Sequence, residues 1–308
     1  MILFNYLFIC IIFGTTFFAI KIGIDAGVAP FFSASLRFFI AGVIVILFYK
    51  IRQAPFPPLR MILQLAIIGF FLTFGTFSTL YWAEQHIPSG LAAVLSAFGP
   101  IMVLLLKKYE DKSKFSPIQV LGLIASLCGV ALIAWPGMNG DVNAIWIIGS
   151  IVVILGQLFY SVGTIRSKKI MSSSSQFSPF LLNGFQMLFG GIMLLLLSLI
   201  IERPSLASFS NMTAQLSLIY LIFFGSILGH GIFYWLVGKT NPVFPSTWLY
   251  VSPIIAMILG ITFLSEEIYL ISIFGSILVL VGVFFTNQET FKEYYNKGSL
   301  IKKVAKNI

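Results

Sequence analysis

The sequence predicts an all-α integral membrane protein whose ten transmembrane helices form two inverted five-helix repeats. Three observations lead to this fold class: apolar residues come in long blocks, charged residues are scarce, and the second half of the chain repeats the first. Hydrophobic residues make up 58% of the 308 residues and charged residues only 9%, whereas soluble domains carry roughly 25% charged residues. A soluble fold of this length could not cover its surface with so few charges.

Ten apolar blocks follow one another along the chain, and most are close to twenty residues long. That is about the length of helix needed to cross a hydrocarbon core roughly 30 Å thick, and a helix satisfies its backbone hydrogen bonds within the segment, as lipid requires. A β-barrel would instead show alternating segments of about ten residues. The predicted helices cover residues 3–22, 30–49, 62–83, 89–106, 117–134, 145–165, 180–201, 216–237, 243–264 and 268–286.

Basic residues gather in alternate loops between these blocks. The loops around residues 50–60, 107–114, 166–169 and 239, together with the C-terminal tail, hold most of the 19 Lys and Arg residues. Acidic residues, among them Glu84, Glu202 and Glu266, fall at the opposite helix ends, where we expect Glu84 to be a solvated or structural group. The positive-inside rule therefore predicts that both termini lie in the cytoplasm.

An internal repeat relates the two halves of the chain. A shift of 153 residues pairs Phe70-Phe71 with Phe223-Phe224, Tyr81-Trp82 with Tyr234-Trp235, Pro100 with Pro253, Gly122 with Gly275, and Gly129 with Gly282. A shift of 149 residues pairs Pro30 with Pro179, Arg37 with Gln186, and Gly42 with Gly191. Because each half has an odd number of helices, the second half must enter the membrane from the opposite side, as in many secondary transporters. The predicted parts are a first repeat over 1–140, a second over 141–287, and a basic cytoplasmic tail over 288–308.

Short motifs follow in a fixed order along almost the whole chain. They are Gly14 with Lys21, Arg37 with Ala41-Gly42, Tyr81-Trp82-Ala83, Ala92-Ala93-Val94, Pro100, Leu264-Ser265-Glu266, Gly275 and Gly282-Val283. This order resembles the EamA-like proteins of the drug/metabolite transporter (DMT) superfamily, although the chain departs from their pattern at residues 107–111, Pro242 and Pro245. The resemblance implies a ten-helix fold and metabolite transport, often export, across the inner membrane of bacteria.

Few ionisable groups lie inside the predicted helices. A charge at the bilayer centre costs roughly 2.5–3.5 kcal/mol on insertion scales, which makes each such group a candidate for function. His230 lies between two glycines. Its ring either donates a hydrogen bond to a substrate or shuttles a proton, or it is a packed neutral ring that bonds to a nearby carbonyl group. Lys21 either attracts a substrate carboxylate or reaches to the interface near Asp25. Arg37 either contacts substrate or bonds carbonyl groups between helices.

Aromatic pairs occupy matched positions in the two halves. Tyr81-Trp82 and Tyr234-Trp235 suit the wall of a symmetric cavity, and an interfacial aromatic belt is the alternative explanation. An aromatic wall would suit amphipathic or aromatic solutes, or cations held over the ring faces. Weaker candidates of the same kind are Tyr160, Trp248 and Tyr250.

Two prolines, Pro100 and Pro253, fall inside predicted helices at matched positions. Proline removes a backbone donor and kinks a helix. Both are predicted hinges for alternating access, and a static kink that aids packing is the alternative.

The predicted function is secondary transport of small metabolites by alternating access, with export of amino acids or related compounds as the leading expectation. A lipid flippase and a non-catalytic membrane subunit of the same fold are the alternatives. An enzyme is not expected, because the sequence has no paired intramembrane acids, His-rich cluster, metal-ligand spacing or ATP-binding motif. The expected partners are a small-molecule substrate and the lipid bilayer, with a coupling proton and a homodimer as options and no nucleic acid or cofactor.

Overall fold

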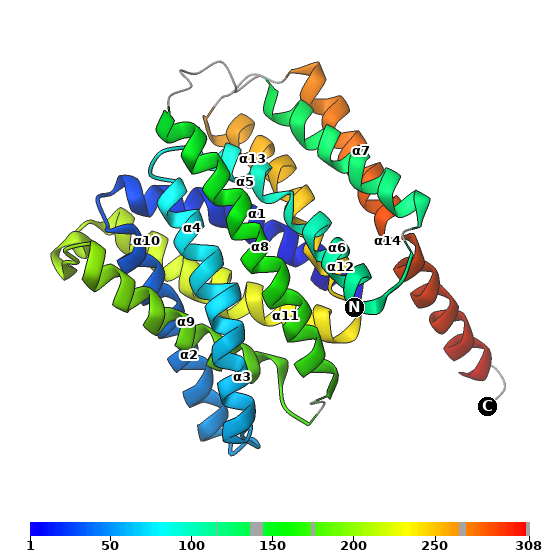
Figure 1. The fold of residues 1–308 in the computed structure, drawn as a ribbon, viewed down its shortest axis with the longest axis horizontal. Coiled ribbons are helices and arrows are strands. Elements are labelled where there is room, and N and C mark those ends of the chain that lie inside the picture. The colour runs from blue at the N-terminus through cyan, green and yellow to red at the C-terminus, as the bar shows by residue number, and fades with distance from the viewer. Residues whose placement is uncertain (115, 136–143, 174–175, 265–268, 306–308) are drawn as a thin grey trace.

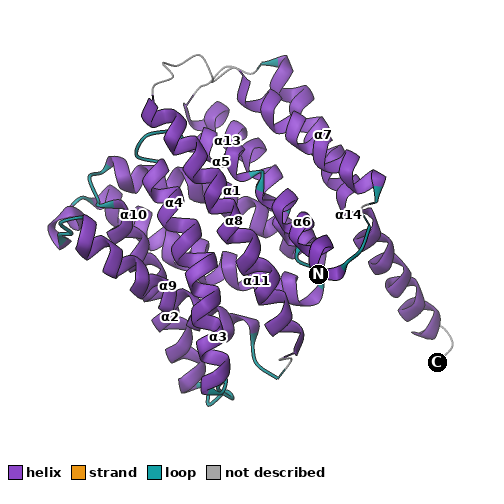
Figure 2. Cartoon of the chain, viewed as in Figure 1, coloured by secondary structure: helices purple, strands orange, loops and turns teal. Residues whose placement is uncertain are grey.

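The computed structural model describes residues 1–114, 116–135, 144–173, 176–264 and 269–305, a part of the chain that contains helices and loops and no strand (Figure 1, Figure 2). Its first elements are α1 (Ile2–Asp25), α2 (Pro30–Ile51), α3 (Leu59–Gly69), η1 (Phe70–Gly75), α4 (Thr76–Ala83), α5 (Ser89–Ser96), α6 (Gly99–Asp111) and α7 (Pro117–Ala134). The later elements are α8 (Ala144–Ser173), α9 (Pro179–Ile201), η3 (Leu206–Ser210), α10 (Met212–Tyr220), η4 (Leu221–His230), α11 (Gly231–Lys239), α12 (Val243–Ser246), α13 (Trp248–Leu264) and α14 (Leu270–Ala305).

Seven helical stretches in the described residues are long and apolar enough to cross a membrane. They are Ile2–Asp25, Pro30–Ile51, Leu59–Ala83, Ser89–Asp111, Ala144–Ser173, Pro179–Ile201 and Met212–Lys239. Three shorter apolar stretches, Pro117–Ile133, Val243–Ile255 and Ile273–Gln288, fall on the fifth, ninth and tenth predicted helices. The all-helical membrane architecture is therefore confirmed, and the number of crossings and their inverted arrangement stay predictions.

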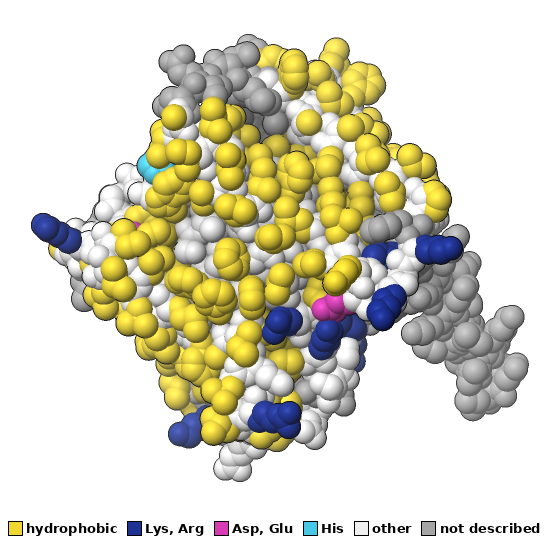
Figure 3. All heavy atoms as spheres, in the orientation of Figure 1, with side chains coloured by type: hydrophobic (Ala, Val, Ile, Leu, Met, Phe, Trp, Pro, Cys, Tyr) yellow, Lys and Arg dark blue, Asp and Glu magenta, His cyan; other side chains and the backbone are white. Residues whose placement is uncertain are grey.

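The outer surface of the bundle is apolar, as a lipid-facing surface must be. Phe4, Leu7 and Ile11 lie on one face of α1 and are exposed, whereas Ile9 and Phe13 of the same helix are buried in the core. Hydrophobic side chains cover most of the molecular face in Figure 3, and Lys and Arg side chains lie mainly along its lower margin. An apolar surface of this extent marks contact with a membrane rather than with water.

Two helices extend far beyond their predicted ends. Helix α8 continues to Ser173 and α14 continues to Ala305, well beyond the predicted ends at residues 165 and 286. Hydropathy identifies only the part of a helix that suits lipid, and Lys, Glu and other polar residues extend the same helix into water because they are good helix formers.

The fourth predicted helix is not continuous. It consists of α5 and α6, which are separated by a turn at Ala97 and Phe98, and Pro100 is the second residue of α6. Proline is well tolerated in a first helical turn, where its missing N–H would have had no intrahelical partner. The expectation that Pro100 lies in a helix interior was therefore wrong, whereas Pro253 does lie inside α13 and is buried.

Two long spans contain π-helical segments at comparable positions. η1 interrupts the span from Leu59 to Ala83, and η4 interrupts the span from Met212 to Lys239. A π-helical turn bonds over five residues rather than four, and such segments are rare and frequent at functional sites. In both segments a side chain bonds to a carbonyl five residues earlier: Thr76 Oγ1 to the Phe71 oxygen at 3.0 Å, and His230 Nδ1 to the Gly225 oxygen at 2.8 Å.

Glycines allow two pairs of helices to pack with their backbones in close contact. A Cβ atom added to Gly42 of α2 would lie 2.7 Å from the backbone nitrogen of Leu188 in α9, and one added to Gly191 would lie 2.6 Å from the backbone nitrogen of Phe39. Glycines bring the backbones of α7 and α14 equally close. These two helices run side by side at one edge of the bundle in Figure 1. There, added Cβ atoms at Gly129 and Gly282 would each lie 2.5 Å from a backbone oxygen, of Gly275 and Gly122 respectively.

Gly42→Ala is expected to destabilise the protein, because the new methyl group would meet backbone atoms of α9 that move only with the helix. Overpacking of this kind costs about 1–3 kcal/mol, which should appear as a lower unfolding temperature of the detergent-purified protein. Gly90→Ala is the matched control, since a Cβ at Gly90 in α5 meets no atom within 4 Å. Equal unfolding temperatures for the two variants would show that α2 and α9 do not pack this closely.

Candidate functional site

Arg37 occupies the centre of the bundle, where its side chain is 1% exposed. Its Nε donates a hydrogen bond to Ser226 Oγ at 2.8 Å, and its Nη1 donates to the Tyr81 hydroxyl at 3.4 Å. The guanidinium also lies over the rings of Phe38 and Phe77, with Cζ 4.6 and 5.0 Å from the ring centroids. Arginine suits such a place because its flat, weakly hydrated cation can donate several hydrogen bonds and stack on aromatic faces at the same time.

Gln186 of α9 occupies a corresponding place and is fully buried. Its Nε2 donates to Thr73 Oγ1, and its Oε1 accepts a hydrogen bond from the Tyr234 hydroxyl. Both polar ends of the amide are thereby bonded, as a buried amide requires.

Arg37, Thr73, Tyr81, Gln186, Ser226 and Tyr234 together form what we call the central polar network. The shift of 149 residues relates Arg37 to Gln186, and the shift of 153 relates Thr73 to Ser226 and Tyr81 to Tyr234. Each of the two long polar side chains therefore bonds to the tyrosine of its own half of the sequence and to the hydroxyl group of the other half. Sequence analysis identified Arg37 and the two tyrosines, but it identified neither hydroxyl partner.

His230 ends η4 and lies beside this network. Its ring centroid is 5.0 Å from that of Phe13, 5.7 Å from Phe38 and 5.6 Å from Phe77. Since the Gly225 carbonyl oxygen can only accept, the Nδ1 atom that contacts it carries the hydrogen. In the neutral ring Nε2 is then a hydrogen-bond acceptor, so this side chain can accept a hydrogen bond from a donor group of a solute.

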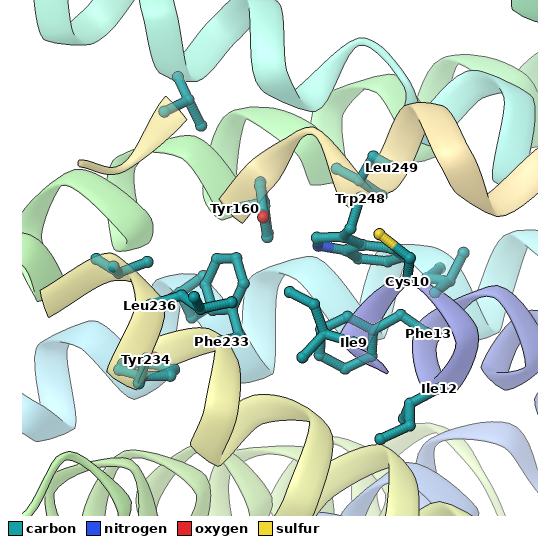
Figure 4. Packing of buried hydrophobic residues seen from close by; sticks show 14 of the residues in the cluster. Ile9, Cys10, Ile12, Phe13, Tyr160, Phe233, Tyr234, Leu236, Trp248 and Leu249 are labelled. Atoms are coloured by element: carbon teal, nitrogen blue, oxygen red, sulfur yellow. The ribbon is translucent and has the colours of Figure 1, made fainter. Parts of the chain in front are cut away.

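Phe13 separates His230 from a second group of aromatic side chains. The Trp248 ring lies 4.5 Å from the Phe13 ring, and the Tyr160 ring lies 6.0 Å from that of Phe233 (Figure 4). The Tyr160 hydroxyl donates to Ser246 Oγ at 3.2 Å. The structure therefore gathers Tyr160 and Trp248 near His230 in one aromatic region, although they come from α8 and α13.

The two repeat-related tryptophans, Trp82 and Trp235, lie apart from the central polar network. Trp82 and Trp235 are half-buried, and the Trp82 ring packs against His86 at 4.8 Å. Neighbouring residues on a helix point about 100° apart. For this reason Tyr81 and Tyr234 face the centre while the adjacent tryptophans do not.

Lys21 and Glu84 meet at the end of α4. Lys21 Nζ lies 2.8 Å from the Asp25 carboxylate, which agrees with one of the two alternatives for this residue, and donates to the backbone oxygen of Glu84 at 3.3 Å. The Glu84 side chain has no exposed surface, which excludes the solvated one of the two expected roles and leaves the structural one. The chain turns back toward α5 immediately after α4, and sequence alone does not show whether a side chain in such a turn faces water or the protein interior.

Glu202 also has a role that the sequence did not reveal. Its two carboxylate oxygens accept hydrogen bonds from the backbone nitrogens of Phe31 and Phe32 at 2.9 and 3.0 Å, and Ser198 Oγ donates to it at 2.6 Å. A carboxylate at a helix N-terminus satisfies free N–H groups and complements the helix dipole. Glu202 thus fastens the end of α9 to the start of α2.

A metal centre finds no support in the described part of the chain, where no group of three or more His, Cys, Asp or Glu side chains comes together. The chemistry available at the centre of the bundle is hydrogen bonding, one buried cation and aromatic surface.

Comparison with known proteins agrees with this description. The model of the EamA-like transporter family matches residues 1–135 and again 147–288. An uncharacterized inner membrane transporter of Escherichia coli K12, YedA, is 29% identical over 260 residues, covering 84% of this chain and 81% of the relative. A probable amino-acid metabolite efflux pump of the same organism is 26% identical over 285 residues, covering 90% and 92%.

One solved structure, titled only as the crystal structure of a protein, shares the fold. It superposes with a TM-score of 0.74 at 15% sequence identity and covers 94% of this chain and 97% of its own. The family model covers both halves and nearly all of the predicted spans. The chain belongs to the EamA-like transporter family and is a membrane transporter.

Proposed function

We propose that this protein is a secondary transporter that exports amino acids or related small metabolites across the bacterial cytoplasmic membrane by alternating access. The observation that carries the proposal is the central polar network. It has two arms, Arg37 with Ser226 and Gln186 with Thr73, and each arm joins one half of the chain to the other. In alternating access, two repeats rock against each other around a site near the bilayer midplane. The choice of amino-acid compounds rests on the name of the efflux pump that the chain resembles.

Several features support two inverted repeats as the moving parts. The family model matches twice. The π-helical segments fall at comparable positions, and the glycines that lie in the two closest helix contacts are repeat mates. The contacts between α7 and α14 run in opposite chain order, Gly122 with Gly282 and Gly129 with Gly275, as a two-fold axis in the membrane plane would produce. Both termini are proposed to lie in the cytoplasm.

The proposed binding region lies around His230 and Arg37, between the two halves. Arg37 and Lys21 would attract a carboxylate group, and His230 Nε2 would accept a hydrogen bond from an ammonium or hydroxyl group. Tyr160, Trp248, Tyr81 and Tyr234 would bound the region, while Trp82 and Trp235 would contact the solute only at its periphery. A small zwitterion offers both the charge and the donor that these groups accept.

The prolines of the fourth and ninth predicted spans are the proposed hinges. Pro100 begins α6 directly after a non-helical turn, and Pro253 interrupts hydrogen bonding inside α13. A few residues at helix ends can absorb the dihedral change of a rocking motion. The two prolines then define where each half bends.

The direct test is solute flux through the purified protein in proteoliposomes. Compounds are first chosen by the rise in unfolding temperature that bound ligand produces. They are then loaded into vesicles and their efflux is followed by mass spectrometry. We expect efflux of at least one amino acid or related compound. Lipid scrambling without flux of any compound would instead assign the chain to the lipid flippases.

Arg37→Gln is expected to lower transport by about tenfold or more, because it removes the buried cation from the network while keeping an amide that can donate. Gln is also the residue at the matched position in the other half. Initial efflux rates per folded protein are the measurement. Arg52→Gln, on the exposed end of the same helix, is the control and should transport normally. Normal transport by Arg37→Gln would remove this residue from the binding region.

His230→Ala is expected to lower transport by about tenfold or more, with a much smaller loss of folded yield, because an ionisable group within a span usually serves function. Efflux rate and yield of monodisperse protein are measured in parallel. His86→Ala is the control, since His86 lies outside the central region against Trp82. If transport and yield fall by the same factor, His230 is a structural residue.

A further inference from the structure

The Glu84 carboxyl group is unusual among the acids of this protein. Its side chain has no exposed surface, and neither Oε1 nor Oε2 has a hydrogen-bond partner among the described residues. Asp25 and Glu110, by contrast, are 59% and 39% exposed and form ion pairs, and Glu202 accepts several hydrogen bonds. Burying an ionised carboxylate without hydrogen bonds costs so much that such a group normally takes up a proton instead.

The charged and titratable groups around Glu84 come from a few elements. Helix α1 contributes Lys21 and Asp25, α2 contributes Arg37, and its own segment contributes Tyr81 and His86. The residues of α5, and the part of α8 that packs near Ala83 and Ile87, contain no titratable side chain.

The two nearby cations bond to other groups. Lys21 Nζ contacts the Asp25 carboxylate and the backbone oxygen of Glu84, and Arg37 donates to Ser226 and Tyr81. Burial raises the pKa of Glu84 well above its ordinary value, while the charges of Lys21 and Arg37 lower it only in part and that of Asp25 raises it further. Burial without a hydrogen-bond partner in the described part of the chain therefore favours the neutral form of this carboxyl group in this conformation.

We infer that Glu84 is a proton-binding site of the transporter, protonated while this end of the bundle is closed and deprotonated when the end opens to water. The inference rests on the proposed alternating access, because only a conformational change exposes the group. Opening hydrates the carboxylate and lets it ionise beside Lys21, and closing requires that it take a proton from the adjacent solution. Proton binding and conformation are then linked, and each biases the other by the same free energy.

The site lies where the pH of the outer solution would act on it. Glu84 follows the end of α4 that is predicted to face the outside, so it takes up protons from the outer solution and returns them to it, and external acid favours the closed state of this end. It is also near the centre, because Tyr81, one helical turn earlier, bonds to Arg37 of the central polar network. A proton on Glu84 can therefore influence the network through one helical turn.

Glu84→Gln provides a test that needs no substrate. A carboxyl group whose pKa is raised on folding binds more protons in the folded than in the unfolded state, from about pH 4.5 up to the folded-state pKa. Wild type should therefore lose stability as pH rises through this range, and Glu84→Gln, which keeps the shape and does not titrate, should not. The measurement is the unfolding temperature of both proteins in detergent from about pH 5 to 9.

Glu110→Gln, an exposed acid in an ion pair, is the matched control and should keep the pH dependence of wild type. The expected result is a difference between Glu84→Gln and wild type that grows with pH in favour of the variant. A difference that is constant, or that favours wild type at high pH, would overturn the inference. Infrared spectra give a second measurement: the band of a protonated buried carboxyl group should be present in wild type near pH 7, lost from wild type at high pH, and missing from Glu84→Gln.

Control by external pH is tested separately from flux. Lowering the external pH favours the closed outer end, so it should change the efflux rate of wild type and of Glu110→Gln, and the ratio of the rates at low and high external pH should fall to about one in Glu84→Gln. Flux in wild type that does not depend on external pH would overturn this control and leave transport intact. A pH-dependent stability difference without flux of any solute would do the reverse, keeping the proton site and overturning the proposed transport.

Discussion

Inside a bilayer, a polar group has only the protein to bond with, and this constraint governs the whole structure. Water is absent from the hydrocarbon core, so backbone groups are satisfied in helices and side-chain polar groups by one another. Arg37 and Gln186 follow this rule at the centre, where each bonds to hydroxyl groups from other spans. The π-helical segments follow it too, since Thr76 and His230 bond to carbonyl oxygens within them. The places where polar groups occur inside the membrane are therefore also the places where helices are held to each other.

The same constraint shapes packing. Lipid tails are as apolar as leucine, so helices in a membrane gain little by hiding apolar side chains from them, and close van der Waals contact must hold them together. Gly42 with Gly191, and Gly129 with Gly282, allow that contact by letting backbones approach directly. Larger apolar residues such as Phe4 and Leu7 remain on the outside, where lipid solvates them.

The sequence predicted the features that depend on local composition. Apolar blocks located the membrane-spanning helices because partition into lipid is set by each segment, and Lys21 with Asp25 was predictable because residues four apart share a helix face. The break before Pro100 was missed, because a proline fits both a kinked helix and the first turn of a new one.

The candidate site was less predictable than the spans. The Gln186 contact with Thr73 joins residues 113 positions apart, and it depends on how each helix is rotated about its axis, which hydropathy does not encode. The burial of Glu84 was not predictable for the same reason: it results from the path of the chain after α4 and from the packing of α1, not from its neighbours in sequence.

The central polar network has one charged arm and one neutral arm, and this difference has an energetic meaning. If two inverted halves were identical, the conformation open to one side would be the image of the conformation open to the other, and the two would have equal free energy. Arg37 and Gln186 break that equivalence at corresponding positions. A difference of about 1.4 kcal/mol between the two states corresponds to a tenfold preference for one. Divergence at a single pair of matched residues is therefore enough to give a duplicated protein a resting orientation, and with it a preferred side from which a solute first enters.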